Sequence, residues 1–258
     1  MAVRRSNIGW CDFSGGDANF IIGCTPKSEG CQNCYARRII EGRLGRDFSD
    51  VRLYPKKLHR LAKTKFEENG IPFRRGPGSR PIVFPCDLSD LFHPNVPDDL
   101  ILEGLRIMGQ RDDVDWAVLT KRVRRLAYFD LVHLYEGFPP NVWIGTTVEN
   151  RKRAEERIPI LRKVRAKVRW LSMEPLLEDV NVDFYLKQRN RPRSENVHWV
   201  IVGAESGSDR RPFDVSWARS IYAECKATGV AFFGKQDSGS RPGVPLLIDG
   251  REIKEFPA

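Results

Sequence analysis

The chain has 258 residues, 41% hydrophobic and 30% charged, so it can bury a sizeable core and global disorder is excluded. No apolar run approaches the roughly 18 residues of a membrane span, and the charged N-terminus lacks the apolar stretch of a signal peptide, so we expect a cytoplasmic protein. The 43 basic and 34 acidic residues give a net charge of +9, which favours a nucleic acid or nucleotide-like partner.

Short apolar runs alternate with helical patterns along most of the chain. A cysteine-rich loop at residues 20–36 leads into a helical pattern at 35–42, and the Gly- and Pro-rich residues 71–81 predict a loop. Strands are predicted at residues 81–86, 115–120, 142–147, 168–173, 198–203 and 230–234. Helices are predicted at residues 97–108, 121–134, 150–164 and 215–228, and a second polar loop at 188–196.

This alternation, which repeats about every 30 residues, is typical of βα units and a parallel sheet. Five or more such units in one chain favour a barrel or partial barrel over a doubly wound sheet. We therefore predict a single α/β domain spanning residues 1–258, with βα units over 80–240 and a short C-terminal tail at 241–258.

Polar side chains follow the predicted strands, where parallel α/β folds place their functional groups. Glu174 and Glu205 come directly after apolar strands, and a carboxylate at that depth needs a partner. We favour one shared polar site over separate helix caps, although Asp90, Asn150 and Ser206 have cap chemistry. The candidates are Ser89, Asp90, Lys121, Arg122, Thr146, Thr147, Glu149, Asn150, Glu174, Glu205, Lys235 and Gln236.

Three of the six cysteines, Cys24, Cys31 and Cys34, form a Cys-x6-Cys-x2-Cys pattern that indicates a metal centre. Three thiolates leave one position of a four-coordinate centre open. Structural zinc would need a fourth ligand, for which Cys11 is the candidate. A [4Fe–4S] cluster would keep one iron free for a small molecule. A redox role for free thiols is a third reading.

Other conspicuous residues are interpreted as structural. Cys86 and Cys225 lie in apolar contexts typical of buried thiols. The tryptophans within the predicted strands, Trp116, Trp143, Trp170 and Trp199, are expected in the core. The basic run at residues 162–169 leads into a strand, so we expect it as solvated surface at the opposite end from the site. No histidine pair has metal-ligand spacing.

The cysteine pattern belongs to an ordered set of landmarks. They are Gly23-Cys24, Gly30-Cys31, Cys34-Tyr35, and residues 87–93 (DLSDLFH), 119–122 (LTKR), 143–150 (WIGTTVEN), 171–176 (LSMEPL), 202–207 (VGAESG) and 233–236 (FGKQ). With these landmarks the chain resembles the radical S-adenosylmethionine (radical SAM) superfamily. It is most similar to a phage and bacterial family of radical-SAM-like proteins with a widened cysteine motif. The usual superfamily spacing is Cys-x3-Cys-x2-Cys, and Asn33 stands where an aromatic residue usually precedes the last cysteine.

The resemblance implies a partial (βα) barrel with a [4Fe–4S] cluster on Cys24, Cys31 and Cys34, in the loop after the first strand. The open iron would chelate SAM, and one electron from an external donor would cleave SAM to a 5′-deoxyadenosyl radical. For SAM, the resemblance favours Ser89 and Asp90 near the methionine amino group and Thr146, Thr147, Glu149 and Asn150 near the ribose or carboxylate. Glu174 and Glu205 are candidates for SAM or substrate.

The cationic and polar residues Lys121, Arg122, Lys235 and Gln236 suit phosphate groups, and the loop residues Arg74, Arg75 and Arg80 would have to fold toward them. The leading hypothesis is a radical SAM enzyme that modifies or rearranges a nucleic-acid-linked substrate, such as a modified base in phage DNA, in the host cytoplasm. An isomerase reaction is one outcome of that kind. The alternative is a non-catalytic nucleic-acid-binding protein with zinc in the cysteine loop.

Overall fold

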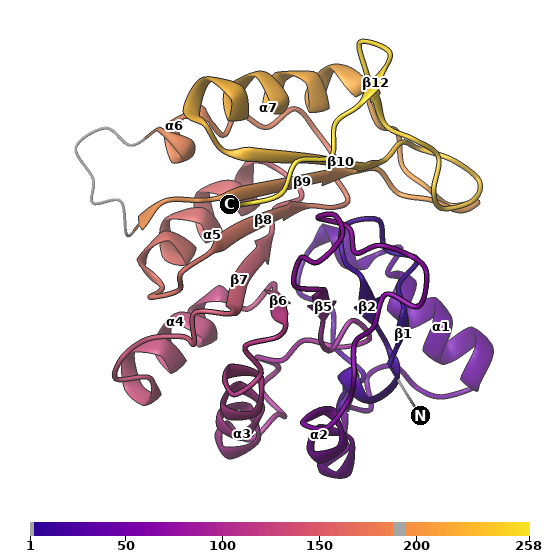
Figure 1. Cartoon of the computed structure of the whole chain (residues 1–258). Coiled ribbons are helices and arrows are strands. Elements are labelled where there is room, and N and C mark those ends of the chain that lie inside the picture. The colour runs from indigo at the N-terminus through magenta and orange to yellow at the C-terminus, as the bar shows by residue number, and fades with distance from the viewer. Residues whose placement is uncertain (1–2, 188–194) are drawn as a thin grey trace.

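Eight strands form one curved sheet that closes about half of a barrel (Figure 1). The computed structural model describes residues 3–187 and 195–258. The strands, in sheet order, are β1 (Arg4–Arg5), β2 (Phe13–Ser14), β5 (Ile82–Phe84), β6 (Asp115–Thr120), β7 (Val142–Thr147), β8 (Arg169–Met173), β9 (Trp199–Gly203) and β10 (Ala231–Gln236). Neighbours from β2 to β10 are parallel, and β1 is antiparallel to β2. The predicted α/β partial barrel is confirmed.

Helices lie on the outer side of the curved sheet (Figure 1). They are α1 (Tyr35–Leu44), α2 (Pro55–Leu61), α3 (Asp98–Gly109), α4 (Val123–His133), α5 (Arg151–Lys163), α6 (Asp183–Leu186) and α7 (Val215–Thr228). All five predicted helices are present, whereas α2 and α6 were not predicted. The Asn150 side chain caps α5 by accepting a hydrogen bond from the backbone N–H of Arg153 at 2.9 Å.

Short elements complete the chain around the cysteines. β3 (Ile21–Ile22) pairs with β4 (Arg52–Leu53), and β11 (Leu247–Ile248) pairs with β12 (Arg251–Glu252). Two 3-10 turns, η1 (Gly16–Ala18) and η2 (Glu29–Cys31), lie between β2 and α1. The segment from residue 24 to residue 34, the cysteine loop, therefore lies between β3 and α1.

Side chains alternate between two apolar layers along each strand. One layer packs under the helices and includes Trp116, and the other fills the inside of the barrel with Trp10, Trp143, Trp170 and Trp199. The predicted core tryptophans are all at most 4% exposed. These rings fill the barrel interior at the amino ends of the strands, and we call the opposite, carboxyl ends the mouth.

Gly145 on β7 makes this ring packing possible. A Cβ atom there would lie 2.3 Å from Cε2 of the Trp170 indole. Any side chain at Gly145 would therefore collide with a rigid buried ring.

Two predictions about arginines are wrong. The basic run at 162–169 is not all solvated surface, because Arg162 and Arg169 are each 2% exposed. Arg169 donates hydrogen bonds to the backbone carbonyls of Val164 and Asn196, which replace the water that the guanidinium loses on burial.

The arginines of the Gly- and Pro-rich loop lie at the amino end of the barrel. Arg75 bonds Asp115, the first residue of β6, and its guanidinium stacks 5.2 Å from the centre of the Trp143 ring. Arg80 lies 3.8 Å from the same carboxylate. The loop therefore does not fold toward the mouth. Residues 188–194 of the second predicted loop lie outside the described residues.

Within the described ranges, no helix is long and apolar enough to cross a membrane.

Candidate active site

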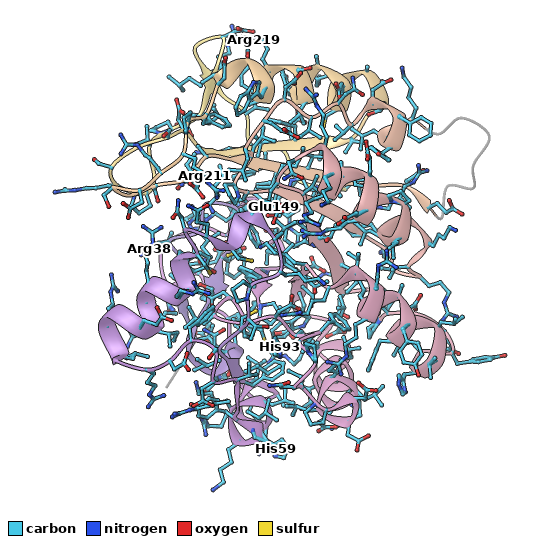
Figure 2. All side chains as sticks on the ribbon, turned by 180° about the vertical axis from the view of Figure 1, so that it is seen from behind. Arg38, His59, His93, Glu149, Arg211 and Arg219 are labelled. Carbon is cyan, nitrogen blue, oxygen red and sulfur yellow. The ribbon has the colours of Figure 1, made fainter. Side chains whose placement is uncertain are left out.

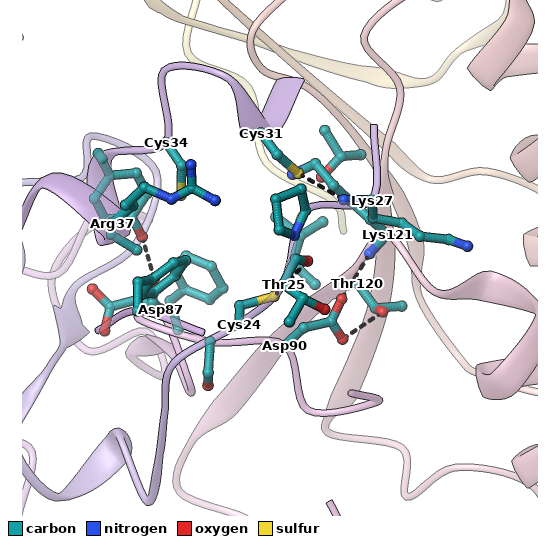
Figure 3. A pocket seen from close by; sticks show the side chains of 18 residues that line it. Cys24, Thr25, Lys27, Cys31, Cys34, Arg37, Asp87, Asp90, Thr120 and Lys121 are labelled. Carbon is teal, nitrogen blue, oxygen red and sulfur yellow. Dashed lines mark hydrogen bonds between the residues drawn. The ribbon is translucent and has the colours of Figure 1, made fainter. Parts of the chain in front are cut away.

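Cys24, Cys31 and Cys34 line one cavity of about 110 Å³ at the mouth of the barrel (Figure 3). Cys24 follows β3, Cys31 ends the turn η2, and Cys34 directly precedes α1. All three are partly buried and none is in a disulfide. The three thiols thus come from three separate segments and meet at one cavity.

The ends of three strands close the other side of this cavity. Among the predicted site residues, those that line it with the cysteines are Ser89, Asp90, Lys121 and Thr147. Asp87 also lines it, with its Oδ1 atom buried and without a hydrogen-bond partner among the described residues. Burial raises the pKa of the Asp87 carboxyl. Polar residues that follow or end β5, β6 and β7 thus lie together at this cavity.

Arg122 and Asp90 support the first cysteine. Arg122 donates to the backbone oxygen of Thr25 at 3.0 Å and to its Oγ1 at 2.9 Å, and its Nη2 lies 4.0 Å from Cys24 Sγ. Asp90 Oδ1 accepts from the Thr120 hydroxyl at 2.7 Å. Arg122 thus points into the protein and holds the cysteine loop. Burial raises the pKa of the Cys24 thiol to about 11, against the opposing effect of Arg122.

His93, which sequence reasoning left without a role, completes this support. Its Nδ1 accepts from the backbone N–H of Asn95 at 3.1 Å, so the proton of the neutral ring is on Nε2, 2.9 Å from Thr25 Oγ1. Burial lowers the pKa of His93, and the charge of Arg122 lowers it further. The neutral ring therefore serves as a donor to Thr25. The Asp-x-x-His spacing of the landmark at 87–93 gave no indication of this contact.

Glu149 anchors the widened part of the cysteine motif. Its carboxylate is fully buried, pairs with Arg157 Nη1 at 2.9 Å and accepts a hydrogen bond from the Ser28 hydroxyl. A Cβ atom on Gly30 would lie 2.6 Å from Glu149 Cγ, so only glycine fits there. Ser28 and Gly30 belong to the six residues between Cys24 and Cys31. Glu149 therefore supports the cysteine loop and does not line the cavity.

Two further contacts hold the loop across the mouth, the second of them at a carboxylate that also binds Arg211, which Figure 2 labels together with Glu149. Glu29 is bonded by Arg153 at 3.0 Å, which lowers the pKa of Glu29 to about 2. Glu205, beyond β9, accepts from the Asn33 amide at 2.9 Å and from the backbone N–H of Arg211 at 2.8 Å. Burial opposes ionisation of Glu205, but the Arg211 guanidinium, whose Nε donates to Glu205 Oε2 at 3.1 Å, outweighs it together with the backbone and Asn33 hydrogen bonds and lowers the pKa of Glu205.

The remaining predicted residues lie around the cavity without lining it. Asn150 contacts Glu29 at 3.4 Å besides capping α5, and the Thr146 hydroxyl donates to the Thr120 carbonyl at 2.8 Å. Gln236 donates to the Ala204 carbonyl at 2.9 Å and so fixes a loop. Asn150 and Glu205 therefore both contact the cysteine loop, and neither they nor Glu174, which we predicted around one cavity with them, line the cavity of the three cysteines.

Glu174 and Lys235 form an ion pair inside the barrel. Lys235 Nζ lies 2.6 Å from Glu174 Oε2, and the Ser172 hydroxyl donates to Glu174 Oε1 at 3.3 Å. Both side chains come from strand faces that point inward, above the tryptophan layer.

In the described part of the chain, no three His, Cys, Asp or Glu side chains converge as ligands of one metal ion. Cys11 is fully buried, donates toward Ser6 Oγ at 3.3 Å and packs in the inner apolar layer, so it does not serve as a fourth ligand beside the other three. In an iron–sulfur cluster each thiolate binds a different iron, so the sulfur atoms need not converge.

A family described as "Protein of unknown function (DUF5131)" matches residues 5–244. The chain belongs to the DUF5131 family. No curated protein gives a significant match.

Solved structures of spore photoproduct lyase share the fold. One, of a mutant with a tyrosine replaced by phenylalanine, has 10% sequence identity and a TM-score of 0.54, over 94% of this chain and 80% of that one. Another, of a mutant with a cysteine replaced by alanine, has 11% identity and a TM-score of 0.53, over 93% and 78%. The complex with dinucleoside spore photoproduct has 14% identity and a TM-score of 0.50, over 88% of this chain. The DUF5131 chain covers 64% of the length of that lyase. The chain thus shares the fold of spore photoproduct lyase.

Proposed function

We propose that the protein is a radical SAM enzyme that acts on a nucleic-acid-linked or nucleotide-like substrate. The observation that carries the proposal is the cavity at the barrel mouth, which the three cysteines of the widened motif share. The partial barrel fold supports it independently, because the sequence landmarks and the fold lead to the same superfamily.

Cys24, Cys31 and Cys34 would hold a [4Fe–4S] cluster with one iron left free. Bound there, the cluster would supply the electron that cleaves SAM to methionine and a 5′-deoxyadenosyl radical for hydrogen abstraction from the substrate. The chain's own contribution is support. Arg122 would position the backbone next to Cys24 through its bonds to Thr25, and Glu149 and Glu205 would hold the cysteine loop over the mouth.

The cavity lining supplies groups that would bind SAM. Ser89 and Asp90 lie on the β5 side, and Thr147 on the β7 side. Hydroxyl groups suit a ribose, and a carboxylate suits the ammonium of SAM. The tryptophan layer below keeps water out of the barrel, which protects a reactive radical from side reactions.

A nucleotide-like substrate agrees with the net charge of +9 and with Lys121, which lines the cavity without an ion-pair partner among the described residues. The lyase with the same fold is complexed with a dinucleoside spore photoproduct, which supports a substrate of related chemistry. A modified base in phage DNA is our specific proposal, with rearrangement or base modification as the reaction.

The test is anaerobic reconstitution of the full chain with iron and sulfide, followed by metal analysis and a visible absorption spectrum. We expect about four irons per chain and the broad absorption of a cluster. A colourless protein that takes up one zinc and no iron would instead support the non-catalytic nucleic-acid-binding protein.

A further inference from the structure

A row of polar side chains crosses the inner face of the barrel from the cysteine cavity toward β10. Thr147 on β7 lines the cavity, and its register partner on β8 is Ser172. Ser172 in turn donates to Glu174, which pairs with Lys235. The row lies directly above the inner apolar layer, which includes Trp170, Trp199 and Phe233 on the same strands.

The ion pair at the end of this row is open to the mouth. The side chains of Glu174 and Lys235 are 11% and 24% exposed. Helix α7 packs on β10 from outside and the tryptophans close the barrel below, so this exposure faces the mouth. Gly203 lies between the pair on β9, where a Cβ atom would be only 3.5 Å from Glu174 Cγ and from Lys235 Cβ.

Thr147 provides an independent sign of a ligand. Its side chain is fully buried, yet its Oγ1 has no hydrogen-bond partner within residues 3–187 and 195–258. A buried hydroxyl without a partner is unfavourable, so a bound molecule in the cavity is the natural source of the missing bond.

We propose that the Glu174–Lys235 pair recognises the edge of a nucleobase that carries an N–H beside a C=O, as in thymine, uracil or guanine. This inference rests on the proposed function and names the part of the substrate that enters the barrel. The carboxylate accepts from the ring N–H, and the ammonium donates to the adjacent carbonyl oxygen. Both contacts are charge-assisted, and their 2.6 Å spacing matches groups on neighbouring ring atoms.

This arrangement agrees with how enzymes hold a base during chemistry on it. Such enzymes read the hydrogen-bonding edge of a base in a closed pocket. In this arrangement the recognised edge of the base lies on the β8–β10 side, and the rest of the base points toward Thr147 and the cysteines. The methionine end of SAM also carries an ammonium and a carboxylate, and its binding to the pair is the competing outcome of the test.

The experiment measures binding of thymidine and N3-methylthymidine to the iron-loaded full chain, without SAM. The methyl group replaces the ring N–H and adds bulk at the same edge, so we expect thymidine to bind about tenfold or more tightly, at least the effect of one charge-assisted hydrogen bond. Glu174→Gln and Lys235→Met should each weaken thymidine binding by a similar factor. The control pair Lys187→Met and Asp183→Asn removes an ion pair of 2.5 Å on the outer helix α6 and should change nothing.

The exchanged variant Glu174→Lys/Lys235→Glu separates recognition from folding. It keeps an ion pair, so it should melt like the unaltered protein, but it reverses donor and acceptor and should lose the preference for thymidine over N3-methylthymidine. Equal binding of the two nucleosides, no thymidine binding at millimolar concentration, or an exchanged variant that keeps the preference would overturn the proposal. So would a Glu174→Gln protein that loses SAM binding and keeps thymidine binding.

The outcomes distinguish a failure of the base contact from a failure of the proposed function. A protein that cleaves SAM but does not distinguish the nucleosides refutes only the base contact. A protein that distinguishes them but does not cleave SAM refutes only the enzyme.

Discussion

The two ends of the barrel differ in how their interior is filled. At the amino end, Arg75 is bonded to Asp115 and Arg169 to backbone carbonyls, and the interior is filled by tryptophan rings. At the mouth, Thr147 and Asp87 each keep a buried oxygen without a partner among the described residues, and a cavity remains between them and the cysteines. The barrel interior is therefore filled by packed rings at the amino end, whereas the mouth keeps a cavity beside the three cysteines.

Removing a cysteine at the mouth should have the largest effect. Cys24→Ala, Cys31→Ala and Cys34→Ala should each reduce iron from about four per chain to nearly none, because three thiolates are the minimum for this cluster. Cys225→Ala is the matched control, since that thiol is fully buried among apolar residues under the helices. Iron and sulfide analysis after reconstitution checks this, and full iron retention in the Cys31→Ala protein would refute the ligand assignment.

Loss of Glu149, which anchors the cysteine loop, should have the next largest effect. Glu149→Gln leaves the buried Arg157 guanidinium without its counter-charge, so we expect the free energy of unfolding to fall by about 3–5 kcal/mol. Glu156→Gln removes an exposed partner of Arg153 and should cost less than about 1 kcal/mol. Urea unfolding of the apo-proteins measures both. Similar values for the two variants would show that Glu149 is not an anchor.

Charge reversal at the two ends should affect DNA binding differently. Lys121→Glu at the mouth should weaken binding and reduce the salt dependence by about 0.7 to 0.9 log units per log unit of salt for the one lost phosphate contact. Lys167→Glu, exposed at the amino end, should leave that slope unchanged. Arg122 is not a suitable probe because it holds the cysteine loop. A salt series with single-stranded and duplex DNA gives the slopes, and equal slopes for both variants would place the DNA elsewhere.

The smallest expected effect is on pH dependence. Burial lowers the pKa of His93 at the mouth and of His198 at the amino end. Below about pH 6.5 the unfolded chain takes up protons that the folded chain does not, so stability present above that pH is lost as the pH falls toward the folded pKa values. His93→Gln should remove only the mouth contribution. Unfolding free energies between about pH 7.5 and 5 test this, and identical pH profiles for the variant and the original chain would contradict it.

The sequence predicted the regular parts of this fold and only part of the site. The bounds of β6 and β7 were predicted to the residue because their side chains are buried on both faces, whereas β2, with two residues, is too short to show periodicity. The cysteines were identified by spacing. The roles of Glu149 and Arg122 were not, because position at a strand end does not specify whether a side chain faces the cavity or the loop that covers it.

We propose above all that the three-cysteine cavity supports reductive cleavage of SAM. The most direct measurement is formation of 5′-deoxyadenosine by the anaerobically reconstituted chain with SAM and a strong reductant. We predict 5′-deoxyadenosine from the unaltered protein and none from Cys31→Ala. A protein that holds about four irons but forms no 5′-deoxyadenosine would contradict the proposed cleavage of SAM at this cavity.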